Sequence, residues 1–230
     1  MGTILLQGGA EFSGQMAESD NRAIELAGGV DAKILIIPAA AAPDERQDVA
    51  GQAGVAWFKS LGATNVEVIP IIDRDSAENL TNRKTLREAK LIYLLSGNAN
   101  YLATTLRGSS AHEAMQDAYE NGAVIAGCGA GAVVMSDPFF DNISQRSQKG
   151  LGFIQKICVL PSHDQIGSRW ANRVRTVIPM SVLIGLDEET GILFEDEAWH
   201  VLGAGCASVY RGSEIRQFAS GESFTLVKKQ

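Results

Sequence analysis

The sequence predicts an α/β fold in which a mostly parallel sheet lies between two layers of helices. Segments typical of strands and helices alternate along most of the chain, and parallel strands need crossover connections of this kind. The segment 33–38, KILIIP, is apolar on both faces, as a strand buried in a parallel sheet should be. The length of 230 residues suits one such domain. We therefore expect a single three-layer α/β/α domain over residues 1–230, with antiparallel strands towards its C-terminal end.

The first elements follow from apolar runs and the glycines that end them. A strand is expected at 3–7, where the run stops at Gly8-Gly9. A helix is expected at 19–27, which Gly28-Gly29 ends. The strand at 33–38 comes next and closes the first strand–helix–strand unit.

The next helix and strand are predicted from spacing. Apolar residues recur at every fourth position within 44–61, which predicts a helix whose buried face is formed by Val49, Ala53, Trp57 and Leu61. The segment 65–72 is β-branched and is expected as a strand, with Pro70 marking an edge or a strand end. A helix at 80–89 and a strand at 91–95 continue the alternation.

A turn at 96–98 separates that strand from the following helix. Ser110 and Glu113 have the spacing of a capping box, which predicts the start of this helix. Its expected apolar face is Ala111, Ala114, Met115 and Ala118, and we expect His112 on the exposed side. Gly122 ends the helix, and 123–126 is the next strand.

Beyond about residue 150 the pattern changes to short strands with one helix near 169–177. The expected strands lie at 157–160, 181–186, 191–194, 200–202, 207–210 and 223–227. His200 falls within one of them and is expected to be structural.

Composition and charge exclude several classes of protein. The formal net charge of −7 argues against a general surface for nucleic acid or an anionic membrane. No apolar run approaches the roughly 18 residues of a membrane-spanning helix, and the N-terminus lacks a secretory pattern. The three cysteines, Cys128, Cys158 and Cys206, lack CxxC spacing, so neither a disulfide framework nor a cysteine-rich zinc site is expected. We expect a cytoplasmic protein without metal or cofactor, and a homodimer remains open.

The glycine-rich turn 127–132, GCGAGA, allows three interpretations. A dinucleotide fingerprint is the weakest, because no acidic residue ends the following strand. A nucleophile elbow would place either Gly129 or, in a register one residue earlier, Cys128 at the exposed position. A close helix–strand crossing with Cys128 as a small buried residue is the third.

Several motifs in order along the chain resemble the peptidase S51 family, which contains cyanophycinases and the aspartyl dipeptidase peptidase E. The strand and elbow 124–132, VIAGCGAGA, resemble that family's Val-Ile-Ala followed by Gly-Thr-Ser-Ala-Gly-Ala, so the family's serine falls on Gly129. Further resemblances are 8–11 (GGAE) to Gly-Gly-Gly-Glu, 36–41 (IIPAAA) to Ile-Pro-Thr-Ala-Ser, 96–99 (SGNA) to Gly-Gly-Asn-Gln, 150–153 (GLGF) to Gly-Leu-Gly-Leu, and 185–190 (GLDEET) to Gly-Ile-Asp-Glu-x-Thr. The resemblance implies the flavodoxin-like fold of class I glutamine amidotransferases.

The resemblance also implies a set of site residues. His163 would be the base, since it follows the strand at 157–160 where α/β sheets place their sites. The acid is open among Asp137, Asp141, Asp187 and Glu188, and the amides of Gly97 and Ala130 would form the oxyanion hole. The substrate-binding candidates are Asn98, Ala99, Arg169 and Arg173, with Arg175 nearby, and arginines suit a small peptide that carries an acidic residue.

Gly129 decides what this set can do, because base-activated attack requires a hydroxyl. The leading prediction is a catalytically silent homologue that binds acidic, aspartyl peptides. Two departures from the family point the same way: Ala99 replaces its glutamine, and Pro161-Ser162 replaces the Asp-Gln before its histidine. The alternatives are an active peptidase, either through Cys128 or with Gly129 as a replacement of a parent serine, and a nucleotide-binding module.

Overall fold

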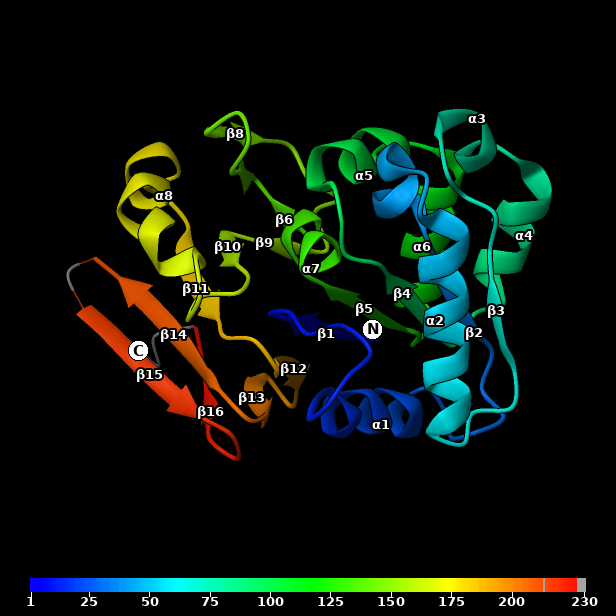
Figure 1. Cartoon of the computed structure of the whole chain (residues 1–230), viewed down its shortest axis with the longest axis horizontal. Coiled ribbons are helices and arrows are strands. Elements are labelled where there is room, and N and C mark those ends of the chain that lie inside the picture. The colour runs from blue at the N-terminus through cyan, green and yellow to red at the C-terminus, as the bar shows by residue number, and fades with distance from the viewer. Residues whose placement is uncertain (213, 227–230) are drawn as a thin grey trace.

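A computed structural model describes residues 1–212 and 214–226 and shows a large, mostly parallel sheet (Figure 1). Its eight strands run in the order β16-β13-β12-β1-β5-β4-β2-β3. The parallel part consists of β1 (Thr3–Gln7), β5 (Val124–Cys128), β4 (Leu91–Leu94), β2 (Ile34–Ile37) and β3 (Val66–Val68). The antiparallel part consists of β12 (Thr190–Glu195), β13 (Ala198–Gly203) and β16 (Ser223–Phe224).

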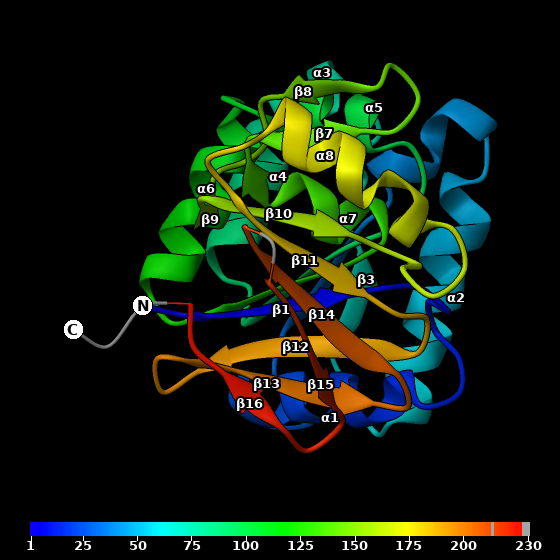
Figure 2. The same ribbon diagram turned by 90° about the vertical axis from the view of Figure 1, so that its left-hand side faces the viewer.

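A second sheet lies beside the first and faces the viewer in Figure 2. Its order is β10 (Ile157–Leu160), β11 (Val182–Leu186), β14 (Cys206–Arg211) and β15 (Glu214–Ala219), of which the first two are parallel. Two short pairs connect the sheets: β6 (Ser136–Asp137) with β9 (Ile154–Gln155), and β7 (Phe139–Asp141) with β8 (Arg146–Gln148). The fold class expected from the sequence is confirmed.

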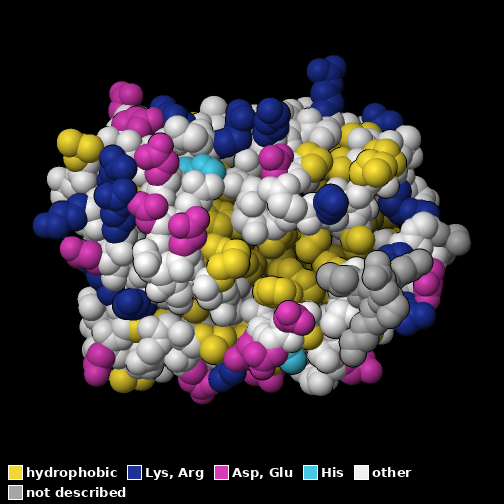
Figure 3. Space-filling view, turned by 180° about the vertical axis from the view of Figure 1, so that it is seen from behind, with side chains coloured by type: hydrophobic (Ala, Val, Ile, Leu, Met, Phe, Trp, Pro, Cys, Tyr) yellow, Lys and Arg dark blue, Asp and Glu magenta, His cyan; other side chains and the backbone are white. Residues whose placement is uncertain are grey.

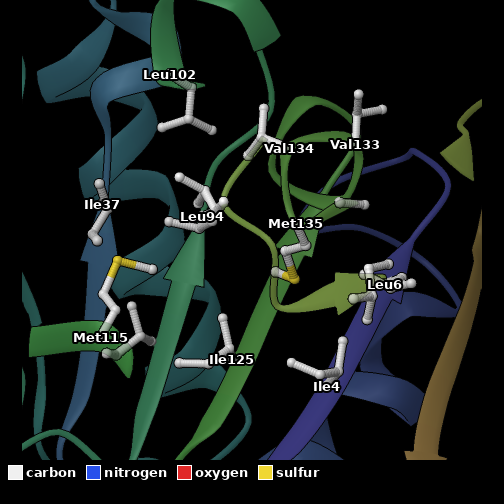
Figure 4. Close-up of a cluster of buried hydrophobic side chains, with 14 of the residues drawn as sticks. Ile4, Leu6, Ile37, Leu94, Leu102, Met115, Ile125, Val133, Val134 and Met135 are labelled. Carbon is white, nitrogen blue, oxygen red and sulfur yellow. The ribbon is translucent and has the colours of Figure 1, made fainter. Parts of the chain in front are cut away.

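Helices cover both faces of the large sheet because its strands are apolar on both sides. One core holds Leu5, Ile36 and Tyr93 against α1 (Met16–Leu26) and α2 (Gln47–Ser60). The opposite core holds Leu6, Ile37, Leu94 and Ile125 against side chains such as Leu102, Met115 and Val133 (Figure 4). These come from α5 (Ala99–Leu106), α6 (Ser110–Glu120) and α7 (Ala130–Val134), and α4 (Leu80–Arg87) packs on the same side.

The predicted face of the second helix is only partly right, because Trp57 and Leu61 are partly buried and pack against the core but Val49 and Ala53 do not. Val49 is 68% exposed and Ala53 is exposed, whereas Gly51, Gly54 and Phe58 are buried. A Cβ on Gly54 would lie 2.7 Å from the Ile36 side chain, so the helix approaches the sheet through its glycines. The four-residue spacing of apolar residues therefore identified the packed side at Trp57 and Leu61 but not in the first half of the helix. The helix is also preceded by a separate 3₁₀ turn, η1 (Ala39–Asp44).

The expected cap and exposure of His112 are corrected as well. Ser109 is the N-cap of α6, since its side chain accepts a hydrogen bond from the His112 amide. The His112 ring is only 7% exposed, with Nε2 2.9 Å from the Leu151 carbonyl and Nδ1 accepting from the Gly108 amide. Burial lowers the pKa of His112. This histidine therefore anchors the 150s segment to α6.

Other departures have local causes. The strand expected at 65–72 shortens to β3 because Pro70 cannot donate to a ladder. The short α3 (Arg74–Ala77), α5 and β15 were not predicted, and neither were the four small strands β6 to β9. The helix near 169–177 divides into η2 (Gly167–Trp170) and α8 (Ala171–Val177). The last predicted strand, at 223–227, shortens to β16, since residues 225 and 226 are not in a strand; residue 227 lies outside the described residues.

The back of the molecule carries an apolar hollow (Figure 3). Its lining includes Met1, Ile4, Tyr119, Phe153 and Trp199. Ile4 lies at the start of β1 and Met1 just precedes that strand, so this hollow lies away from the carboxyl edge where open α/β sheets bind ligands. Within the described residues, every helix is too short or too polar to cross a membrane.

Candidate active site

The carboxyl edge of the parallel sheet brings the predicted motifs together. The Gly129 amide donates to the Gln7 carbonyl at the end of β1 (3.0 Å), which fixes the end of β5 beside it. The Ser162 amide donates to Gly8 (2.8 Å), and the Asn98 amide donates to Ala40 (2.8 Å). Segments that follow β1, β2, β4, β5 and β10 therefore meet at one place.

Gly129 occupies the elbow between β5 and α7. It has φ +49° and ψ −108°, a conformation that side chains rarely adopt. The neighbouring glycines are required by close packing: a Cβ on Gly131 would lie 2.1 Å from the Leu94 carbonyl oxygen, and one on Gly127 would lie 2.6 Å from Gly131. The turn therefore has the shape of a nucleophile elbow, with no side chain at its apex.

Ser96 takes the space above that apex, a feature that sequence reasoning missed. A Cβ on Gly129 would lie 2.3 Å from Ser96 Oγ and 3.2 Å from Ser96 Cβ. Ser96 is partly buried and lies two residues after the end of β4. The only sequence signal was that the segment 96–99 begins with serine where the resembling motif begins with glycine.

A cavity of about 130 Å³ opens beside the elbow. Its polar lining includes Gly97, Asn98, Ala130, Asp141 and Ser162. Its apolar lining consists of Ala99, Val133, Phe140, Ile143, Val159, Leu160, Pro161, Ile166 and Trp170. We call this cavity the cleft.

Two backbone amides at the cleft are available to a ligand. The amides of Gly97 and Ala130 donate no hydrogen bond to any part of the chain that the structure describes. Unpaired N–H groups beside an elbow are the donors that stabilise a developing oxyanion in acyl transfer. The two residues that the sequence assigned to an oxyanion hole thus both line the cleft.

His163 is held away from the cleft. Its ring is 7% exposed and packs so closely on β11 that a Cβ on Gly185 would lie 2.2 Å from His163 Cδ2. His163 Nδ1 lies 3.4 Å from Asp187 Oδ1, and Nε2 lies 2.7 Å from the Tyr210 hydroxyl. The nitrogen that would face a nucleophile in a serine hydrolase is therefore engaged by Tyr210.

Of the four candidate acids, Asp187 is the one that contacts His163; its other oxygen accepts from the Cys206 amide at 3.0 Å. Asp137 accepts from the Gly150 amide, and Asp141 accepts from the Ser144 hydroxyl at 2.6 Å within its own turn. Glu188 accepts from the Ser162 hydroxyl at 2.7 Å. Each of these three carboxylates has a local partner other than the histidine.

The substrate-binding candidates divide into two groups. Asn98 and Ala99 line the cleft, and Asn98 Oδ1 also caps α5 by accepting from the Tyr101 amide at 2.9 Å. Arg169 and Arg173 are exposed and lie outside the lining, although Arg169 belongs to the same turn as Gly167 and Trp170, which do line it. Arg175 donates to the Gly212 carbonyl instead.

Cys128 lies below the elbow and points into the core shared with α1 and α2. It pairs with Gln7 in the β1–β5 ladder and has no exposed surface. Burial is the main cause that raises the pKa of its thiol well above the usual value, and nearby carboxylates add to it. The elbow therefore has the register that places Gly129 at the apex, and the one-residue shift that Cys128 would require is absent.

Glu11 is the second functional candidate that sequence reasoning left without a role. Its Oε1 accepts from the Ser96 amide at 2.9 Å. Burial raises the pKa of Glu11 to about 8, with the Ser96 amide lowering it and the Asp20 charge raising it further. The pKa of Asp20 is itself raised by burial to about 7, against hydrogen bonds from Trp57 and Gln7. Within the described residues no group of three His, Cys, Asp or Glu could hold a metal ion.

The parallel sheet, the elbow at its carboxyl edge and the paired amides define an α/β protein of the nucleophile-elbow class. This chain belongs to peptidase family S51, whose sequence pattern matches residues 4–202. It is 27% identical over 226 residues to a cyanophycinase of Geminocystis herdmanii (strain PCC 6308), covering 93% of this chain and 82% of that protein. A cyanophycinase of Trichormus variabilis (strain ATCC 29413 / PCC 7937) is also 27% identical, over 92% of this chain and 74% of its own length.

Solved structures agree with this assignment. The crystal structure of a peptidase from an acI-B1 Actinobacterium superposes with a TM-score of 0.88 at 27% identity, over 98% of this chain and 97% of that one. A putative peptidase E protein from Listeria monocytogenes EGD-e superposes with a TM-score of 0.62 at 17% identity, over 95% and 98%. The second likeness shows the fold alone.

Proposed function

We propose that this chain is a peptide-binding member of family S51 in which the acyl-enzyme route through residue 129 is closed. One observation carries the proposal: the apex of the elbow is Gly129, where the family resemblance places a serine. Loss of a serine nucleophile costs about 10⁶-fold in turnover in a well-studied serine protease, while binding and oxyanion donors survive. The engagement of His163 by Tyr210 supports the same conclusion.

The cleft chemistry supports a short peptide as the ligand. The free amides of Gly97 and Ala130 suit a peptide carbonyl, and the apolar lining suits a neutral side chain. The described lining holds no Lys or Arg, so an acidic side chain would lie at the rim, where Arg169 is exposed. Because the relatives are named cyanophycinases, aspartyl dipeptides are the class we propose.

Calorimetry with Asp-Leu and Leu-Leu, combined with an assay of amine release, tests this proposal. We expect saturable binding of Asp-Leu that an Ala130→Pro variant, which lacks one amide donor, weakens. Amine release from Asp-Leu and from cyanophycin is expected to be at least about 10³-fold slower than that of a cyanophycinase relative assayed in parallel. Absence of binding, or turnover equal to that of the relative, would overturn the proposal.

A further inference from the structure

Ser96 and Gly129 form a complementary pair at the elbow. Ser96 Oγ lies 2.3 Å from the point where a side chain on residue 129 would begin. A nucleophilic hydroxyl oxygen attached to residue 129 would itself lie about 1.4 Å from that same point, given ordinary single-bond lengths. The Ser96 hydroxyl thus lies within the space of the missing group, although it comes from the end of β4 and not of β5.

We propose that Ser96 supplies the acyl-accepting hydroxyl of this site and that Glu11 takes its proton. This inference rests on the proposed peptide-binding function and adds a covalent step to it. It gives a role to one hydroxyl and one carboxylate at the elbow: Ser96 Oγ lies beside Gly129, and Glu11 contacts the Ser96 amide. Neither residue belongs to the triad implied by the family resemblance.

Glu11 is placed to serve Ser96. Its carboxylate already contacts this residue through the Ser96 amide, at 2.9 Å, and rotation about χ1 moves the Ser96 hydroxyl among three staggered positions. Within the described residues Ser96 Oγ makes no hydrogen bond. A carboxyl group with a pKa raised to about 8 is a stronger base than an ordinary glutamate, which suits proton removal near neutral pH.

The backbone around Ser96 is fixed in the way that an acyl acceptor requires. Glu11 holds its amide, and the Asn98 amide two residues later donates to the Ala40 carbonyl. A Cβ on Gly97 would lie 2.3 Å from the Ala40 oxygen, so the turn packs tightly on η1. The free amide of Gly97 directly follows Ser96, and the amide after a nucleophile is a usual oxyanion donor.

His163 does not compete for the role of base to Ser96. Its Nε2 is engaged by the Tyr210 hydroxyl at 2.7 Å. Two further carboxylates at this edge have other partners: Glu188 accepts from Ser162, and Asp141 accepts from Ser144. Glu11 is therefore the carboxylate in contact with the residue that carries the hydroxyl.

The step balances without any added reactant except water. Ser96 Oγ forms a bond to the peptide carbonyl carbon while its proton passes to Glu11. The C–N bond then breaks, and the proton on Glu11 moves to the leaving amine. Water next attacks the ester, giving one proton to Glu11, and the C–O bond to Ser96 breaks as that proton returns to Oγ. The products are a carboxylic acid and an amine.

A fluorophosphonate probe, which labels nucleophilic serines irreversibly, tests the inference on the full chain, with the site mapped by peptide mass. We expect label on Ser96, at a rate that rises with pH up to about 8 in step with ionisation of Glu11. Ser96→Ala should remove at least nine-tenths of the label, and Glu11→Gln, whose amide oxygen can still accept from the Ser96 amide, should slow labelling at least tenfold. Ser60→Ala, on the exposed end of α2, is the matched control and should label as the wild type does.

Two readouts separate this inference from the proposed function. If the wild type binds Asp-Leu but the probe does not label Ser96, the inference is overturned and the proposed function stands. If the wild type does not bind Asp-Leu, the proposed function is overturned. Ser96→Cys guards against misfolding of the alanine variant. Its new thiol should react with iodoacetamide faster than Cys206 does, and a new thiol slower than Cys206 counts against the inference.

Discussion

Adding a single methyl group at the elbow should destabilise the protein in a way that depends on Ser96. Gly129→Ala places a Cβ 2.3 Å from Ser96 Oγ and 3.2 Å from Ser96 Cβ, while the next atom, Ser96 Cα, is 4.0 Å away. Separations below 3.0 Å are not tolerated by real Cβ atoms, so Ser96 must rotate or the turn must shift. Removing the side chain with Ser96→Gly eliminates both short contacts.

The expected free energies follow from these contacts. Holding a non-glycine residue at φ +49° and ψ −108° costs about 1–3 kcal/mol in either background. Overpacking against Ser96 adds about 1–3 kcal/mol, less if rotation of the hydroxyl relieves part of it. We therefore expect Gly129→Ala to lower the unfolding free energy by about 2–6 kcal/mol in the wild type, but only by the backbone strain in the Ser96→Gly background. The coupling energy should be about 1 kcal/mol or more.

Urea unfolding of the four proteins in this double-mutant cycle, followed by circular dichroism, measures the coupling. In thermal scans each kcal/mol corresponds to roughly 2–4 °C in a chain of this size. A coupling energy within about 0.3 kcal/mol of zero would refute the reasoning, because Ser96 would then not occupy the space of residue 129. The double variant Ser96→Gly with Gly129→Ser has glycine at position 96 and serine at position 129, as in the resembling family motifs.

Three further predictions concern groups around the site. The pKa of Glu11 is about 8 in the folded chain, above its usual 4.5. Its contribution to the unfolding free energy is therefore complete below about pH 4.5 and is lost as pH rises towards 8, at up to roughly 1.4 kcal/mol per pH unit. Glu11→Gln should reduce the slope of the unfolding free energy against pH, measured with urea, between about pH 5 and 8, and an unchanged slope would contradict this. Native alkylation by iodoacetamide should modify partly exposed Cys206 and spare buried Cys128, and early modification of Cys128 would mean that the elbow opens. Gly185→Ala should cost about 1–3 kcal/mol, because its Cβ would meet the His163 ring at 2.2 Å, and a thermal scan with no shift would show that the ring moves freely.

Much of the fold was predictable because the relevant signals are local. The strands of the parallel sheet are short apolar runs, such as 3–7 between Gly2 and Gly8 and 33–38 ending at Pro38, and burial on both faces follows from their composition. The side of α2 that packs was not predictable in the same way. Close approach through Gly51 and Gly54 leaves no apolar pattern in the sequence, and larger residues such as Val49 then face solvent.

The candidate site was predictable as a place but not as a set of contacts. The family resemblance predicted that the segments 96–99, 127–132 and 162–163 lie at one edge of the sheet, because the carboxyl ends of parallel strands meet there. The partner of His163 Nε2 is the hydroxyl of Tyr210, which lies on β14. No spacing in the sequence relates these two residues, so this contact could not be predicted. The contact between Glu11 and Ser96 likewise joins the ends of two strands that are not neighbours in the sheet.

This chain has serine at position 96 and glycine at position 129, where the resembling family motifs have glycine and serine. The two changes together bear on how the glycine at the elbow is interpreted. A lost nucleophile alone would leave an empty space above Gly129, and the strained backbone there would be free to relax. Instead, the elbow keeps φ +49°, and the Ser96 hydroxyl lies 2.3 Å from the position that the first side-chain atom of residue 129 would take. Backbone strain at functional sites persists where surrounding contacts hold it, and here Gln7, through the Gly129 amide, and the packing of Gly131 on β4 do so. A retained elbow beside a relocated hydroxyl is better explained by a site that still binds acyl groups than by one that has simply decayed.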